Sequence, residues 1–365
     1  MNITSLLWTK IKFIISVLKH LMKTGLESGQ RQLGLSENLN IKVIKKYFFY
    51  LFYNLIIVVV FLLLFELFIR LFIPEIQLAG TSKNILTGSL YSSSRGLKEN
   101  TTGISNGIKK STNEYHSWKY SGVKSKSKNR ILFLGDSVTM GIGVENDSTF
   151  AGILNNHFNI INPSVIGYSS HDYVNVFNAF ISDNKYDLNY DAVYLFWTLN
   201  DVYADSFIQE QPAFTPDDKI YRFINFLRHN SKAYLFLKNL ISDRSEVYYN
   251  FDSKFYSEEN ELLEKSIENL IYISDKCKEM KIDFFIFLLP YEYQVRNYEN
   301  ESVQKPQETL SESLSLSGIK TIDCITAFKN EFTESHGFYL YGDGIHFSRK
   351  GHNKLAEFTL NQVGY

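Results

Sequence analysis

Short apolar runs alternate with amphipathic segments over residues 130–365 of this 365-residue chain. A run of about four to eight apolar residues between turn-forming residues is typical of a strand buried on both faces of a sheet. The predicted strands are residues 131–134, 159–166, 192–197, 282–289 and 319–325. The predicted helices are residues 150–158, 173–181, 262–280 and 350–360. This alternation predicts a three-layer α/β/α sandwich around a mostly parallel five-stranded sheet.

One connection, residues 202–261, is much longer than the usual link between neighbouring elements. It contains residues 220–241, an amphipathic helical pattern that is broken at His229 and Asn230. Such an insertion can serve as a lid or a substrate-binding element, or it can form an extra packed helical layer. The sequence leaves both interpretations open.

Residues 47–73 form an apolar stretch that is long enough to cross a bilayer. Tyr47, Tyr50 and Tyr53 cluster at one end, as the aromatic belt of a membrane interface does. Pro74 ends the predicted helix because proline cannot continue the helical hydrogen bonds. We therefore expect a single transmembrane helix ahead of the α/β domain.

Residues 1–46 carry an excess of lysine and arginine over their two acidic residues, Glu27 and Glu37. The positive-inside rule then predicts a single-pass protein of the cell membrane, with a cytoplasmic N-terminus and an extracytoplasmic C-terminal domain. A cleaved signal peptide is disfavoured, since the apolar region is too long and no convincing small-residue cleavage site follows it. Residues 5–23 can form an amphipathic helix, either on the inner leaflet or against a partner.

Residues 74–129 separate the predicted membrane helix from the predicted sheet. From residue 79 on they are rich in Ser, Gly, Thr, Asn and Lys and show no sustained periodicity. They are therefore predicted to be a stalk or a loosely ordered lead-in. The catalytic domain is predicted to span residues 130–365.

The overall composition limits the classes of partner. The formal net charge is −1, so no global basic field favours nucleic acid as a partner. Cys277 and Cys324 lie far apart without the spacing of metal ligands, and two buried thiols are favoured over a disulfide. No histidine cluster or phosphate-binding glycine loop is present, so neither a metal nor a cofactor is expected.

Chemistry-bearing residues follow the predicted strands. Ser137 comes directly after the first strand, Gly167 after the second and Asn200 after the third, while Asp343 and His346 precede the last helix. In an open parallel sheet, ligands bind beyond the carboxyl ends of the strands, so these residues are expected to meet there. A serine hydroxyl needs an adjacent base to act as a nucleophile, and the base needs an orienting group.

These motifs resemble the SGNH (GDSL-type) hydrolase superfamily, whose four sequence blocks contribute Ser, Gly, Asn and His. Ser137 lies in Gly-Asp-Ser, Asn200 in Asn-Asp, and His346 in Asp-Gly-Ile-His, which begins at Asp343. The second block is matched at Gly167, and the similarity covers roughly residues 129–364. The resemblance implies the SGNH hydrolase fold for this region.

The resemblance also implies a role for each residue. Ser137 is the expected nucleophile, His346 the general base and acid, and Asp343 the group that fixes the imidazole tautomer. The backbone N–H groups of Ser137 and Gly167 and the side-chain amide of Asn200 are expected to form the oxyanion hole. One departure is Thr198, which stands where the third block usually has glycine and narrows the space near the acyl group.

Three functions are compatible with these residues. The favoured one is a membrane-anchored serine esterase that removes small acyl groups from an extracytoplasmic substrate, such as an envelope glycan; a lipid substrate is a variant of it. The second is an O-acyltransferase that modifies cell-envelope polysaccharide with the same residues, and it would need an acceptor groove. The third is a catalytically silent binding module, which the intact set of site residues disfavours.

Overall fold

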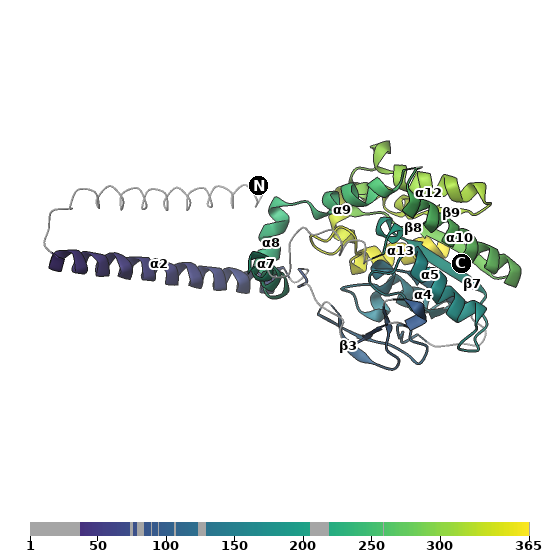
Figure 1. The fold of residues 1–365 in the computed structure, drawn as a ribbon, viewed down its shortest axis with the longest axis horizontal. Coiled ribbons are helices and arrows are strands. Elements are labelled where there is room, and N and C mark those ends of the chain that lie inside the picture. The colour runs from purple at the N-terminus through teal and green to yellow at the C-terminus, as the bar shows by residue number, and fades with distance from the viewer. Residues whose placement is uncertain are drawn as a thin grey trace. The chain divides into compact units, whose positions relative to one another are not determined.

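The structure, a computed structural model, describes residues 37–73, 76–78, 84–204 and 219–364, apart from 89, 94, 106, 123–128 and 258. Residues 66–365 make up one unit, with a five-stranded sheet at its centre (Figure 1). The strands are β5 (Arg130–Gly135), β6 (Asn159–Ile161), β7 (Ala192–Trp197), β8 (Asp283–Leu288) and β9 (Thr321–Asp323). Their order is β6-β5-β7-β8-β9 and every neighbouring pair is parallel, which confirms the predicted sheet.

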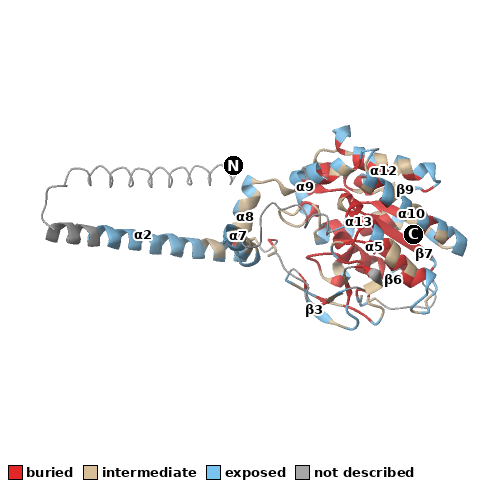
Figure 2. Ribbon diagram, viewed as in Figure 1, coloured by how far each residue is buried: buried red, intermediate tan, exposed pale blue. Residues whose placement is uncertain are grey.

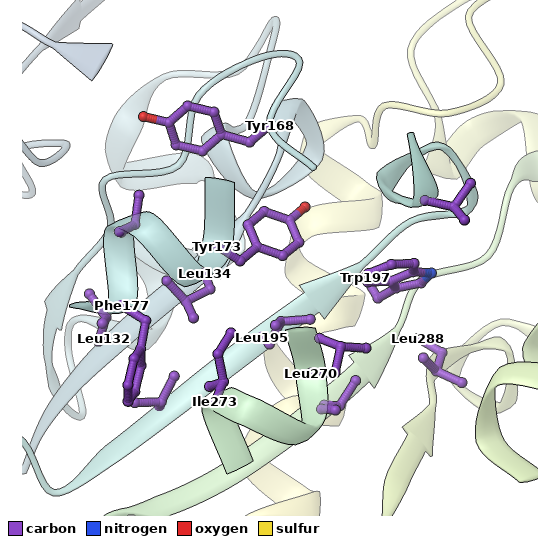
Figure 3. Packing of buried hydrophobic residues seen from close by; sticks show 14 of the residues in the cluster. Leu132, Leu134, Tyr168, Tyr173, Phe177, Leu195, Trp197, Leu270, Ile273 and Leu288 are labelled. Atoms are coloured by element: carbon purple, nitrogen blue, oxygen red, sulfur yellow. The ribbon is translucent and has the colours of Figure 1, made fainter. Parts of the chain in front are cut away.

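One face of the sheet is covered by α5 (Ser170–Phe177), α10 (Glu261–Met280) and α12 (Lys305–Leu316). Successive side chains of a strand point to opposite faces, so Leu132 and Leu134 of β5 point toward these helices. Figure 3 shows this layer, in which the strand residues pack directly against α5 and α10. The long amphipathic pattern of residues 262–280 is confirmed as α10.

The opposite face is covered by α4 (Phe150–Leu154) and α13 (Arg349–Gln362). Here the strands contribute a row of aromatic rings, with Phe133 and Phe196 at 4.9 Å and Phe196 and Phe287 at 4.9 Å between centroids. Each buried ring of this size contributes on the order of 2–3 kcal/mol of transfer free energy. Because both faces are buried, the strands read as continuous apolar runs in the sequence.

The sheet order reverses at β5, because the chain passes from β5 to β6 on one side and then to β7 on the other. The carboxyl ends of β5 and β7 therefore border the crevice where open α/β sheets bind their ligands.

Short helices and turns connect these elements. The short helices are α3 (Ser137–Met140), α9 (Arg244–Asp252) and α11 (Glu292–Arg296). The 3₁₀ or π turns are η1 (Leu90–Ser92), η2 (Asn146–Ser148), η3 (Asn178–Ser182), η4 (Leu199–Val202), η5 (Ser253–Phe255), η6 (Glu301–Val303), η7 (Cys324–Ala327) and η8 (Lys329–Phe338).

The helical pattern inside the long insertion is confirmed as two helices, α7 (Lys219–Asn230) and α8 (Lys232–Ile241). The break falls at Ser231, whose hydroxyl caps α8 by accepting a hydrogen bond from the Tyr234 N–H at 3.0 Å. No residue of α7 is buried, whereas a packed helical layer would bury one of its faces.

The lead-in to the sheet differs from the expected loosely ordered stalk. It contains two antiparallel hairpins, β1 (Leu86–Gly88) with β2 (Arg95–Leu97) and β3 (Thr102–Ser105) with β4 (Ile108–Ser111). Trp118 then docks on the α/β domain, where its indole N–H donates to the Ser164 carbonyl at 2.9 Å. The segment lacks the hydrophobic pattern of a core strand because its strands are only three or four residues long and partly polar.

Lys110 of β4 is buried, although lysine side chains are rarely buried because of their charge. Its ammonium donates to the Met140 carbonyl at 2.9 Å and lies 5.0 Å from the centre of the Trp118 ring. Burial lowers the pKa of Lys110 to about 7.

Cys277 and Cys324 are buried, and both are free thiols, which is the state that the sequence analysis favours over a disulfide.

Ahead of this unit, α2 (Glu37–Phe72) contains the predicted membrane segment. Within the described residues, one helix is long and apolar enough to cross a membrane, the 27-residue Lys46–Phe72, in which an 18-residue stretch has a mean hydropathy of 2.9. Most of its side chains are exposed (Figure 2). The predicted amphipathic helix at residues 5–23 lies outside the described residues.

Candidate active site

Ser137 begins α3 immediately after β5, in a turn that leaves no room for a side chain at position 135. A Cβ at Gly135 would lie 2.0 Å from the Thr139 hydroxyl oxygen and 3.1 Å from the Phe196 carbonyl oxygen. Asp136 caps the short helix, because its Oδ1 accepts from the Val138 N–H at 2.8 Å. The tight turn thus sets Ser137 at the carboxyl end of the central strand.

His346 and Asp343 reach Ser137 from the loop before α13. The His346 Nε2 lies 2.9 Å from the Ser137 Oγ, and its Nδ1 lies 2.8 Å from the Asp343 Oδ1. The same Asp343 oxygen accepts from the backbone N–H of His346 at 2.8 Å, which holds both side chains on one tight turn. Gly344 allows this turn because it adopts φ +82°, where a Cβ would also meet Ser245 at 2.4 Å.

The electrostatics of the pair favour a charged imidazole. Burial alone lowers the pKa of His346, but the adjacent Asp343 carboxylate outweighs burial and holds that pKa above its ordinary value of 6.5. Burial alone would raise the pKa of Asp343, yet His346 and Arg244 hold it well below its usual range. Asp343 is therefore ionised and accepts the Nδ1–H. Once the imidazole is neutral, its Nε2 is the nitrogen that can accept the Ser137 proton.

Asp136 contacts the serine as well as capping α3. Its Oδ2 accepts from the Ser137 hydroxyl at 2.8 Å and from the Asn200 side-chain amide at 3.3 Å. Asn200 follows β7 in η4, so the two strand ends that border the crevice bring Ser137 and Asn200 to one carboxylate oxygen. The structure thus places four of the five predicted residues in one hydrogen-bonded group.

The fifth residue, Gly167, lies in the turn after β6 with φ +79°, a conformation that glycine adopts without strain. Its neighbour Ile166 lines the same cavity as His346 and Asp343.

Thr198, the residue that departs from the usual glycine of the third block, is buried, and its hydroxyl donates to Asp201 Oδ1 at 2.9 Å. Its side chain is therefore directed into the η4 capping turn.

A polar network behind Asn200 was not predicted. The Tyr291 hydroxyl lies 3.0 Å from the Asn200 Oδ1 and 2.7 Å from the Asp252 Oδ2, and Tyr203 also donates to Asp252. Burial raises the pKa of Asp252 to about 6, although its two tyrosine partners lower it in part. Because the Tyr291 hydroxyl lies beside the amide oxygen, the Asn200 NH₂ group is turned toward Asp136.

His352, which follows the site in α13, has a structural role. It is buried against Phe150 at 5.6 Å between ring centroids, and its Nδ1 accepts from the Phe150 N–H at 3.2 Å. Burial lowers its pKa to about 3, so the ring is neutral at ordinary pH.

A cavity of about 350 Å³ reaches the His346 and Asp343 side chains. Helices α7 and α8 of the insertion supply much of its wall, together with Leu340, Tyr341, Asp343 and His346. The α7–α8 junction is fixed by Glu66, whose carboxylate accepts from the N–H groups of Lys232 at 3.0 Å and Ala233 at 2.9 Å. A carboxylate at this position stabilises the start of a helix, because it satisfies free N–H groups and complements the helix dipole.

Comparisons with known proteins find similarity only among solved structures; no protein-family profile and no curated protein matches the chain. A protein assigned to the lipolytic G-D-S-L family from Desulfitobacterium hafniense shares 14% identity and a TM-score of 0.39, over 64% of this chain and 98% of that one. A lipase/acylhydrolase from Enterococcus faecalis shares 15% identity and a TM-score of 0.37, over 64% and 95%. A catalytic mutant of an acetylxylan esterase from Geobacillus stearothermophilus shares 15% identity and a TM-score of 0.38, over 67% and 97%.

Proposed function

We propose that this chain is a serine esterase of the SGNH type. The observation that carries the proposal is the hydrogen-bonded series from Ser137 through His346 to Asp343, with links of 2.9 Å and 2.8 Å. These distances are within the range that proton transfer between a nucleophile and its base requires. A silent binding module would have no need for this continuous geometry.

In the proposed reaction the Ser137 Oγ attacks the ester carbonyl while its proton passes to the His346 Nε2. The imidazolium is stabilised by Asp343 and then gives this proton to the leaving alcohol, which leaves an acyl group on Ser137. Water, deprotonated by His346, releases the acyl group in the second half of the reaction. The negative charge on the carbonyl oxygen is stabilised by the N–H groups of Ser137 and Gly167 and by the Asn200 amide.

Transfer of the acyl group to a sugar hydroxyl is the second candidate. It is favoured by one observation: the insertion helices α7 and α8 wall the cavity beside His346, where an acceptor could replace water. The two candidates differ in the fate of the acyl group, since a hydrolase passes it to water and a transferase to an alcohol.

We expect the full chain in detergent micelles to release one acetate for each nitrophenolate formed from 4-nitrophenyl acetate, with an oligosaccharide acceptor present. Acetate is measured enzymatically, and acetylated oligosaccharide by mass spectrometry. Acetate at stoichiometric yield supports the esterase. Nitrophenolate formation accompanied by acetylated oligosaccharide in place of free acetate would show a transferase.

For localisation, we propose a single-pass membrane protein with its catalytic domain outside the cytoplasm. The span Lys46–Phe72 and the basic residues before it support this orientation. An envelope glycan, or another acylated substrate near the membrane, then becomes the accessible substrate. Alkaline phosphatase fused after Tyr365 should be active, and β-galactosidase fused there should be inactive. The opposite pair of activities would overturn the orientation and leave the chemistry unaffected.

A further inference from the structure

We propose that Arg228, Lys238 and Arg244 form a binding site for an anionic group, a carboxylate or a phosphate, on the alcohol part of the substrate. The inference deepens the proposed esterase function and rests on it for the identity of the ligand as substrate. All three cations line the cavity that His346 and Asp343 also line. They come from α7, α8 and the first turn of α9, so the long insertion brings them together.

Little negative charge lines the cavity to neutralise these three cations. Among the described residues that line it, Asp343 is the only acidic one, and its carboxylate is bonded to His346. Within the described part of the chain, neither Arg228 nor Lys238 forms an ion pair, and both are only partly exposed. Arg244 donates to the Tyr248 hydroxyl and to the Gly342 carbonyl at 3.4 Å, both uncharged acceptors.

The three cations are close enough to affect each other and the triad. Burial first, and then the charges of Arg228 and Arg244, lower the pKa of Lys238 below its ordinary value. Arg244 also helps to hold the pKa of Asp343 down. Three like charges in a partly buried cavity repel each other, and a bound anion removes this cost while it gains charge-assisted hydrogen bonds.

The position of the cluster indicates which part of the substrate it meets. In the proposed reaction His346 returns the proton to the leaving alcohol, so a cavity lined by His346 is placed to receive that alcohol. Arginine binds carboxylate and phosphate through paired N–H groups, and lysine adds a point charge. An acylated glycan or glycerol polymer that carries acidic groups matches these requirements.

Arg222 provides a matched control on the same helix. It is exposed on α7 and is not among the residues that line the cavity, whereas Arg228 is. A general attraction of anions to a basic helix would involve both arginines, but a built site requires Arg228 and Lys238.

The test is calorimetric binding of three probes to the full chain in detergent micelles: trigalacturonate, tri(glycerol phosphate) and the neutral maltotriose. We expect at least one anionic probe to bind about tenfold more tightly than maltotriose or better, with an affinity that falls as salt is added. The R228Q/K238Q variant should lose this preference, and R222Q should keep it. The tighter of the two anions identifies the group as carboxylate or phosphate.

Equal binding of all three probes, or an anion preference retained in R228Q/K238Q, would overturn the inference. Melting temperatures verify the folding of each variant, and the single variants R228Q and K238Q provide the same test if the double variant does not fold. Phosphonate labelling of Ser137 is measured separately on the same preparation. Labelling without an anion preference refutes the inference alone, and an anion preference without labelling contradicts only the esterase.

Discussion

Replacing Asp343 with asparagine is expected to lower kcat/KM for 4-nitrophenyl acetate by about 10⁴-fold. In the parent, the Asp343 carboxylate accepts the His346 Nδ1–H at 2.8 Å and so leaves Nε2 free to take the Ser137 proton. An asparagine amide can instead donate to Nδ1, which places the proton on Nε2 and removes the base. Stopped-flow or plate-based release of nitrophenolate measures the loss.

The same variant tests the electrostatics through the pH profile. Since only the neutral imidazole can accept a proton, kcat/KM of the parent should fall as the pH drops through the raised pKa of His346, above 6.5. Without the carboxylate, the lowering effect of burial is no longer outweighed, so the acid limb of the residual activity should move to lower pH. An unchanged acid limb would contradict the assigned roles.

Asp323→Asn is the matched control for this variant. Asp323 is also a carboxylate that caps a turn at the end of a strand, with its Oδ1 accepting from the Ile325 N–H at 2.9 Å. It is the last residue of β9, the edge strand of the sheet, and two strands separate it from β5, so its replacement removes a similar charge and cap without touching the triad. Activity should stay within about twofold of the parent at a temperature where the variant is folded.

Replacing Asn200 with alanine is expected to lower kcat by about 10²–10³-fold, the usual loss for one oxyanion-hole donor. The Asn200 NH₂ group points toward Asp136, which also accepts from the Ser137 hydroxyl, because Tyr291 lies at hydrogen-bond distance from the Asn200 amide oxygen. KM should change much less than kcat, since the proposed bond forms to the charged oxygen of the transition state.

Tyr291→Phe keeps the Asn200 amide, the proposed oxyanion-hole donor, and removes the Tyr291 hydroxyl that holds this amide in place. Tyr291 is a positioning residue, so its loss should lower kcat by less than the loss of Asn200 does. The double variant should be no worse than Asn200→Ala alone, because the two act on one group. The control is Asn297→Ala, which removes an amide that donates to the Tyr293 carbonyl at 2.8 Å. Additive losses in the double variant would show that Tyr291 acts elsewhere.

The sheet could be predicted from the sequence because its strands are buried on both faces. The apolar run at residues 192–197, for example, is β7 with the predicted bounds. The hairpins before the sheet could not be predicted, since they are short and one of their buried residues is the charged Lys110. Its burial depends on Trp118 and the Met140 carbonyl, which the local sequence does not reveal.

In the candidate site, too, some residues could be predicted from the sequence and others could not. Ser137 and Asn200 could be predicted to meet because they follow neighbouring strands of a parallel sheet. Tyr291 was missed, although it follows the strand at residues 282–289 and the same argument applies to it. Asp252 and Lys238 gave no signal in the sequence, because they reach the site from an insertion whose docking depends on tertiary contacts.

The most direct test of the account is intact-mass analysis of the full chain in detergent micelles after exposure to a fluorophosphonate. The account predicts a single adduct on the parent, mapped to Ser137 by peptide analysis, and no adduct on Ser137→Ala. Such an adduct requires a serine that its base has activated, as the 2.9 Å contact with His346 implies. An unlabelled but folded parent, or equal labelling of Ser137→Ala, would contradict the assignment of Ser137 as the nucleophile.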